Sequence, residues 1–170
     1  MDGPRLRHAC RALILDEHHD LLLCRFDFRH RGRPVVWAAP GGGMDDGESE
    51  LDCLRRELAE EVGLGLGQDP PKVWRHEVVA QGLIDGYDGL VDHYFLLRTT
   101  RFTPRGAFTD QQLEAENITA LTWWSQQDIA GYSGPDVFAP RGLGGHLAAL
   151  LSHGPPEKPL ELFGVEAVAE

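Results

Sequence analysis

The sequence has few cysteines, few basic residues and no long apolar run. Its three cysteines, Cys10, Cys24 and Cys53, are spread over 170 residues and form no CxxC pair. This argues against a disulfide framework or a zinc site and favours reduced thiols. No apolar run approaches the roughly 20 residues that cross a bilayer, and the opening MDGPRLRHAC lacks the apolar core of a secretion signal. We therefore expect a cytoplasmic protein with no membrane partner and one domain over residues 1–170.

Basic residues are outnumbered by acidic ones. The chain has 16 lysines and arginines against 27 aspartates and glutamates, which gives a net charge of −11 at pH 7. Such a chain repels a phosphate backbone, so we expect no nucleic-acid duplex as partner. The densest cationic group is either a solvated loop or a clamp on an anionic substrate, and it comprises Arg25, Arg29, Arg31 and Arg33.

Apolar stretches bounded by turn-forming residues predict a strand-rich chain with few helices. Strands are expected at residues 12–15, 21–26, 35–40, 72–84, 89–102 and 118–125. Helices are expected at 50–62, within 125–132 and at 143–151. The polar segment 103–117 is predicted to be irregular, and the proline-broken tail 153–170 to lie on the surface. This order predicts an α+β or α/β fold with a mixed sheet between helices, closed by a C-terminal helix and tail at about 140–170.

The helix at 50–62 is the best-defined element. Ser49 suits its N-cap, and Gly63 suits the position just past its end. Four apolar residues at helical spacing form one face, Leu51, Leu54, Leu58 and Val62. We expect this face to pack on the sheet.

Three glutamates of this helix, Glu57, Glu60 and Glu61, stand at positions i, i+3 and i+4 and therefore share one arc. Clustered carboxylates repel one another and raise one another's pKa unless a cation lies between them. Oxygen ligands at this density suit Mg²⁺ or Mn²⁺. Pattern alone leaves two interpretations open: a metal site or a solvated acidic face.

The segment around these glutamates narrows the choice. From Gly42, five residues lead to Glu48, seven more lead to Arg56, and the chain continues as RELAEEVGL. This resembles the Nudix hydrolase signature, G-x5-E-x7-R-E-U-x-E-E-x-G-U with U apolar, at all nine defined types over 23 positions, residues 42–64. A Walker-type phosphate loop would end in Gly-Lys-Ser/Thr, whereas Met44 follows the glycines here. A dinucleotide-binding GxGxxG would open a neutral helix, and this helix is acidic.

The resemblance implies a Nudix fold, an α/β/α sandwich with a mixed sheet, and a Mg²⁺-dependent hydrolase in which Mn²⁺ can substitute. By position, it implies that Glu57, Glu60 and Glu61 are metal ligands and catalytic residues, with Glu57 either a ligand or the general base. The carbonyl of Gly41 is a further candidate ligand. The resemblance also implies that Gly42, Gly63 and an ion pair between Glu48 and Arg56 support the loop on the helix. For Glu48 and Arg56, the alternative is an ordinary surface ion pair.

Another catalytic carboxylate often precedes the last core strand in this family. Glu114 and Glu116 occupy that place and could position water or bind a further metal, unless they belong to a merely acidic loop. Substrate-binding candidates are four residues in strands that could equally be structural: Arg25, Trp37, His93 and Tyr94.

The expected function is hydrolysis of a phosphoanhydride bond in a nucleoside diphosphate linked to a group X. Ala80, Gln81 and Gly82 lack hallmarks of the ADP-ribose and dinucleoside-polyphosphate subclasses. A (deoxy)nucleoside triphosphate is therefore the favoured small-molecule partner. A non-catalytic Nudix-fold domain that binds a nucleotide or a partner protein is the main alternative, and an isomerase on this fold is a weaker one. The resemblance also raises the expectation of a homodimer.

Overall fold

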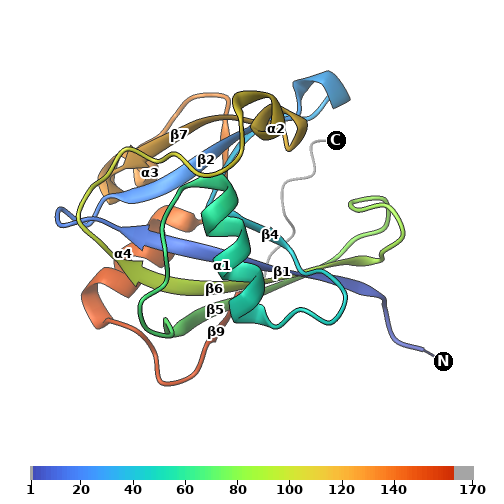
Figure 1. Cartoon of the computed structure of the whole chain (residues 1–170), viewed down its shortest axis with the longest axis horizontal. Helices are drawn as coiled ribbons and strands as arrows, with labels where there is room; N and C mark the ends of the chain where they lie inside the picture. The colour runs from blue at the N-terminus through green and yellow to red at the C-terminus, as the bar shows by residue number, and fades with distance from the viewer. Residues whose placement is uncertain (1, 163–170) are drawn as a thin grey trace.

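The computed structural model describes residues 2–162, and within them nine strands form one mixed sheet (Figure 1). Seven strands follow the order β8-β3-β2-β1-β6-β5-β9, while β4 pairs with β1 and β7 pairs with β2. The pairs β1–β6, β3–β8 and β5–β9 are parallel, and the others are antiparallel. The strands are β1 (Leu6–Leu15), β2 (Leu21–Asp27), β3 (Val35–Ala38), β4 (Gly41–Gly43), β5 (Lys72–Val79), β6 (Gly89–Arg98), β7 (Ile118–Trp124), β8 (Val137–Ala139) and β9 (Leu160–Leu162).

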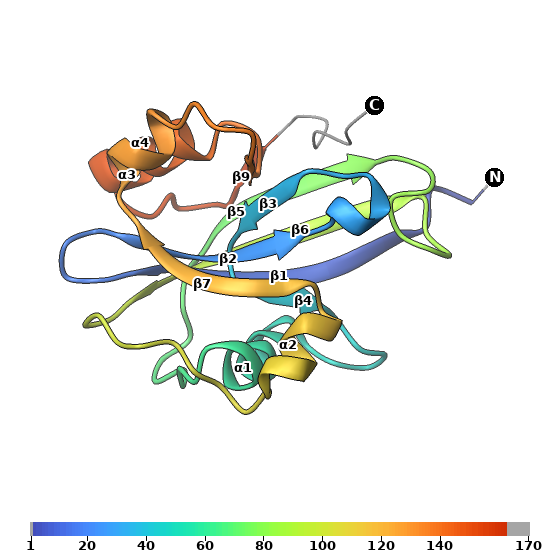
Figure 2. The same ribbon diagram turned by 90° about the horizontal axis from the view of Figure 1, so that it is seen from above.

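Helices cover both faces of this sheet, as Figure 2 shows. They are α1 (Glu50–Glu61), α2 (Asp110–Ala115), α3 (Gln126–Ala130) and α4 (Leu143–His153), with a short 3-10 helix η1 (Arg29–Arg31) after β2. α1 and α2 lie on one side, and α3 and α4 lie on the other. The predicted arrangement of a mixed sheet between helices is confirmed. No helix in the described range 2–162 is long and apolar enough to span a bilayer.

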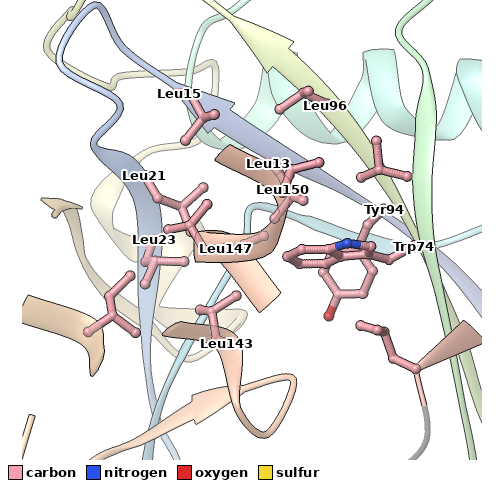
Figure 3. Packing of buried hydrophobic residues seen from close by; sticks show 14 of the residues in the cluster. Leu13, Leu15, Leu21, Leu23, Trp74, Tyr94, Leu96, Leu143, Leu147 and Leu150 are labelled. Atoms are coloured by element: carbon pink, nitrogen blue, oxygen red, sulfur yellow. The ribbon is translucent and has the colours of Figure 1, made fainter. Parts of the chain in front are cut away.

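Alternating side chains of β1 build the two cores, because successive residues of a strand point to opposite faces. Leu13 and Leu15 face α4, where Leu143, Leu147 and Leu150 pack against them (Figure 3). The other cluster joins β1 to α1 and includes Cys10, Ala12, Ile14, Leu54 and Leu58. The apolar side of α1 therefore fixes the helix on the sheet, and Glu57, Glu60 and Glu61 are not part of this packing.

Helix α1 begins and ends where the sequence predicts. The side chain of Ser49 accepts a hydrogen bond from the backbone N–H of Asp52, and Val62 is the C-cap. Gly63 has φ +78°, a conformation that favours glycine, and a Cβ there would lie 2.1 Å from the carbonyl oxygen of Arg105. The end of α1 is thus fixed both by the backbone angle of Gly63 and by the chain that crosses it.

Several boundaries differ from the sequence-based expectation. β1 begins at Leu6, because residues 6–11 pair with β6 although their side chains are mixed in polarity. The glycines 41–43 form β4 instead of an open turn, since their backbones pair with Ala9, Cys10 and Arg11. The segment expected to be irregular contains α2, capped by Thr109. The tail adds β9 to the sheet edge beside β5, and residues 163–170 lie outside the described range.

Candidate active site

The glutamates of α1 do not form a solvated face. Only 8% of the surface of Glu57 and 3% of that of Glu61 is exposed, and Glu60 is partly buried. Burying a carboxylate costs free energy unless a partner compensates its charge. The structure therefore contradicts the solvated alternative for Glu57 and Glu61 and requires an explanation for their burial.

Strand β4 supplies the surface against which these carboxylates lie. The backbone N–H of Gly41 donates a hydrogen bond to Oε2 of Glu61 at 3.0 Å. A Cβ at Gly42 would lie 2.5 Å from Oε1 of Glu57, closer than any real contact of this kind. Glycine at position 42 thus leaves the space in which the Glu57 carboxylate sits.

Arg56 is the central cation of the acidic segment, residues 42–64. Its Nε and Nη2 donate to the two oxygens of Glu48, each at 2.9 Å, and Nη2 also donates to the carbonyl of Gly43 at 3.0 Å. Its Nη1 donates to Glu57 at 3.0 Å and lies 3.5 Å from Oε2 of Glu60. The predicted ion pair of Glu48 with Arg56 is present and bidentate, and it fastens the loop after β4 to α1.

The charges of this segment are unequally compensated. The hydrogen bonds from Arg56 lower the pKa of Glu48 to about 2. Burial raises the pKa of Glu57, against the attraction of Arg56, and burial together with the neighbouring Glu57 raises the pKa of Glu61 to about 8. The nearby protein cations are therefore insufficient for the buried carboxylates, which is the electrostatic situation that a bound cation relieves.

The donor set fits a divalent metal ion of the hard class. Glu57, Glu60 and Glu61 offer carboxylate oxygens, and Gly41, whose carbonyl is the further candidate ligand, lines the same cavity. In the geometry of residues 2–162, no three His, Cys, Asp or Glu side chains converge closely enough to form a ready-made metal site. Arg56 donates to Glu57 and the backbone N–H of Gly41 donates to Glu61, so each of these carboxylates has one oxygen bonded within the protein.

A cavity of about 430 Å³ opens over these carboxylates. Glu116, the C-cap of α2, lines it and also contributes to the raised pKa of Glu61. Glu114 lies elsewhere, along a separate hollow between α2 and β7. Of the two carboxylates that the sequence places before β7, the structure brings only Glu116 to the α1 glutamates.

A second, more apolar cavity of about 240 Å³ continues from the first. Its walls include the aromatic pair Phe26 and Phe28, whose rings are stacked 5.9 Å apart at 4° between planes. Arg31 and Arg33 also line it, so part of the cationic group borders a cavity. Both cavities are lined by the same six residues at their junction: Arg11, Phe26, Phe28, Ile84, Leu90 and Asp92. The two cavities therefore form one cleft with an acidic half and an apolar half.

The four predicted substrate-binding residues have different surroundings. Tyr94 lines the apolar half, although it is almost fully buried. Trp37 is part of the core and donates from Nε1 to Asp136. His93 lies among His8, Lys72 and Glu50, and burial lowers its pKa to about 4. Arg25 bonds to Thr119 and pairs with Asp27. Among the residues described, only Tyr94 of these four borders the cleft.

Sequence reasoning missed several residues of the cleft. Arg7 and Arg11 line the acidic half from β1, and Asp92 lines both halves from β6. A signal was present, because Arg11 and Asp92 are charged residues inside otherwise apolar strands, CRALIL and LVDHYFLL. Such residues are rarely buried without a partner. The pairing across 81 positions could not be read without the sheet register.

Comparisons with known proteins agree with this geometry. A model of the NUDIX domain family matches residues 5–141. An RNA pyrophosphohydrolase of Sulfurovum sp. (strain NBC37-1) is 37% identical over 81 residues, which are 44% of this chain and 52% of the relative. An 8-oxo-dGTP diphosphatase of Proteus vulgaris is 33% identical over 69 residues, covering 40% of this chain and 59% of the relative. The chain thus spans little more than half the length of these relatives.

A comparison with solved structures finds the same fold in a NUDIX hydrolase. The solved structure of a NUDIX hydrolase from Nitrosomonas europaea superposes with a TM-score of 0.63 at 17% identity, over 92% of this chain and 94% of that one. At this identity the likeness concerns the fold alone. The family match extends over most of the chain and contains the whole acidic segment, residues 42–64. The chain belongs to the NUDIX domain family.

Proposed function

We propose that this chain is a divalent-metal-dependent hydrolase that cleaves a phosphoanhydride bond in a nucleoside diphosphate linked to a group X. Mg²⁺ is the proposed ion, and Mn²⁺ can replace it, because the donors are hard oxygens. Nucleoside triphosphates are the first substrate class to test, and the named relatives, a diphosphatase and an RNA pyrophosphohydrolase, support this chemistry.

The single observation that carries the proposal is the burial of Glu57 and Glu61 beside β4. Burial raises the pKa of Glu61 to about 8, so its ionised form destabilises the folded chain near neutral pH, and a bound cation would offset that cost. Such perturbed groups in a cleft are typical of functional sites. A domain that only binds a partner does not need the three glutamates of α1 or the glycines of β4 that lie against them. The enzyme is therefore favoured over the non-catalytic domain.

In the proposed mechanism, Glu57, Glu60 and Glu61 would hold the ion, with the carbonyl of Gly41 as a further ligand. When bound, such a cation neutralises phosphate charge and activates water for attack on phosphorus. Arg7 lines the acidic half and can donate to a phosphate oxygen. The bond between water oxygen and phosphorus forms as the bridging P–O bond breaks.

Glu116 is the proposed general base, because it lines the same cavity at the end of α2 and carboxylates are among the side chains that serve as general bases. Glu48 and Arg56 have a positioning role: they fix the loop after β4 on α1 and thereby the orientation of Glu57. Gly42 and Gly63 support the same geometry through the space they leave and the backbone angle they adopt.

The test is a panel of a nucleoside triphosphate, a nucleoside diphosphate sugar and a nucleoside monophosphate, each with Mg²⁺ and with EDTA. We expect a monophosphate plus pyrophosphate from the first and two monophosphates from the second, both only with the metal. Release of phosphate from the monophosphate alone would overturn the proposal. As a second readout, millimolar Mg²⁺ should raise the Tm, because an ion bound only by the folded state stabilises it.

Two further parts of the proposal concern the setting of the protein. The three cysteines are free and buried, which supports a reducing compartment such as the cytoplasm. The expected homodimer stays a prediction, and sedimentation velocity tests it.

A further inference from the structure

A buried ion pair stands where the two halves of the cleft meet. Arg11 of β1 and Asp92 of β6 are neighbours across the parallel ladder, in which Ala9 lies opposite Asp92 and Arg11 lies opposite Tyr94. Partners in register share a face of the sheet, so Arg11 and Asp92 lie diagonally on the same side.

The pair is fixed from two sides. Nε of Arg11 donates to Oδ1 of Asp92 at 3.0 Å, and Nη1 of Arg11 donates to the carbonyl of Ala39 at 3.1 Å. The side chains are only 19% and 6% exposed. Burial disfavours the charge of Arg11, but Asp92 keeps the pKa of this guanidinium above its ordinary value. Both side chains are therefore held in one orientation without a ligand.

Each member of the pair keeps an unused polar atom. Nη2 of Arg11 and Oδ2 of Asp92 have no hydrogen-bond partner in the part of the chain that the structure describes. Neither belongs to the unpartnered side-chain atoms that are sealed from solvent. Since both residues line both cavities, the junction offers a ligand guanidinium N–H donors and a carboxylate acceptor from one ion pair.

The position of the pair determines what it can meet. On one side are the carboxylates of α1, proposed to hold a metal and phosphates. On the other is the apolar cavity, which the stacked rings of Phe26 and Phe28 border from the junction onwards. A molecule that fills the whole cleft has an anionic end and a flat apolar end. A nucleobase is flat and carries an N–H donor next to an acceptor on its edge, the complement of Asp92 and Arg11.

We infer that Arg11 and Asp92 are specificity-determining residues that recognise the edge of a nucleobase held in the pocket beside Phe26 and Phe28. Nη2 of Arg11 donates to an acceptor of the base, and Oδ2 of Asp92 accepts from its neighbouring N–H. The inference rests on the proposed function, because that function places the phosphates at the α1 carboxylates. It adds that the group bound in the apolar half is the base of the nucleotide.

A phosphate-binding role for Arg11 fits the contacts less well. Asp92 already neutralises Arg11, so the pair brings no net charge to an anion. Arg7 is the better phosphate ligand, because it lines the acidic half and, within residues 2–162, makes no ion pair. The two roles predict different substrate dependence, and that difference is the basis of the experiment.

The experiment compares a nucleoside triphosphate with inorganic triphosphate, which has the same anhydride bond but no base. The main variant is the double substitution Arg11→Met and Asp92→Leu, since a single change would leave an unpaired buried charge and endanger the fold. Arg55→Met is the matched control: Arg55 is on α1 but pairs with Asp52 and Asp69 outside the cleft. Melting curves with Mg²⁺ establish that each variant is folded.

We expect the double variant to lower kcat/KM for the nucleotide by about tenfold or more, the effect of losing hydrogen bonds to a charged pair. Its kcat/KM for inorganic triphosphate should stay within about twofold of the wild type, and Arg55→Met should change neither. Equal losses on both substrates would show that the pair binds phosphate or only supports the fold. An unchanged nucleotide rate would also overturn the inference.

Failure of the proposed function has a different signature. If the wild type hydrolyses neither of these substrates nor the nucleoside diphosphate sugar, the hydrolase proposal fails. Calorimetry with Mg²⁺ then makes the same comparison between the wild type and the double variant through the Kd of each ligand. In that case, two results together still support base recognition. The double variant binds the nucleotide about tenfold or more weakly than the wild type does, and it binds inorganic triphosphate equally well. Equal affinities of wild type and double variant for the nucleotide overturn it.

Discussion

The backbone N–H of Gly41 donates a hydrogen bond of 3.0 Å to the carboxylate of Glu61, and this bond joins strand β4 to the last turn of helix α1. Two segments 20 residues apart thereby meet at the acidic half of the cleft. The bond uses Oε2 of Glu61, and in the proposed mechanism the other oxygen would bind the cation. The geometry of Glu61 thus depends on the β4 backbone as well as on the helix.

We predict that Glu60→Gln and Glu61→Gln each lower kcat by about 10²-fold or more while the fold survives, since a proposed metal ligand is lost but the apolar face of α1 is untouched. Asp52→Asn is the control, because Asp52 is an exposed residue of the same helix that pairs with Arg55. Turnover of a nucleoside triphosphate at saturating Mg²⁺ provides the measurement. Near-full activity of either glutamine variant would refute its assignment as a ligand.

Glu116 and Glu114 should differ in function although they are two positions apart. Glu116 lines the acidic cavity, and Glu114 borders a separate hollow. We expect Glu116→Gln to lower kcat by about 10²-fold or more, as for loss of a general base, with KM little changed. Glu114→Gln should retain activity within about twofold, as for a surface carboxylate. The reverse order of effects in steady-state kinetics would transfer the role to Glu114.

A single methyl group at position 42 should disturb the site. In Gly42→Ala, the added Cβ would stand 2.5 Å from Oε1 of Glu57, so the carboxylate must move. We expect weaker Mg²⁺ binding, seen as a smaller rise of Tm with the metal, together with a large loss of turnover. Gly65→Ala is the matched control, because a Cβ there meets nothing within 4 Å. Equal metal-induced shifts in the two variants would contradict this view of Gly42.

The ion pair of Glu48 with Arg56 should give the protein a distinct response to acid. Hydrogen bonds from Arg56 lower the pKa of Glu48 from its ordinary 4.5 to about 2 in the folded chain. Since the folded state favours the ionised form, this stabilisation is fully present above pH 4.5 and is lost as pH falls towards 2.

Urea unfolding of wild type and Glu48→Gln between pH 2 and 7 measures that contribution as the difference between the two proteins. We expect the wild type to be more stable near neutrality and the difference to shrink as the pH falls through this window. A difference that is constant with pH would show that the role of Glu48 does not depend on its charge.

The acidic half of the cleft was predictable because its residues are close in sequence. Helical spacing placed Glu57, Glu60 and Glu61 on one arc, and the cap at Ser49 fixed where the helix begins. The pairing of the glycines with β1 was not predictable, because three glycines carry no side-chain pattern. The helical state of α2 was missed because its short polar sequence has only Leu113 as a buried residue.

The apolar half depends on register between strands far apart in the chain. Arg11 meets Asp92 only because β1 and β6 run parallel with Ala9 opposite Asp92. A shift of one position would have turned either side chain to the face that α1 covers. Trp37 and His93 were substrate-binding candidates for a similar reason, and the sheet places Trp37 in the core and His93 beside Lys72.

The junction between the two cavities separates the proposed hydrolysis from the proposed base recognition, both in space and along the sequence. The acidic half takes its carboxylates and glycines largely from the continuous segment 41–61, whereas the apolar half takes none of its lining from that segment. Mutations in β2, β6 or the residues near 84 can therefore alter which molecule enters without touching the groups proposed for hydrolysis. A cleft divided in this way can acquire a new substrate in small inherited steps while its bond-breaking half stays the same.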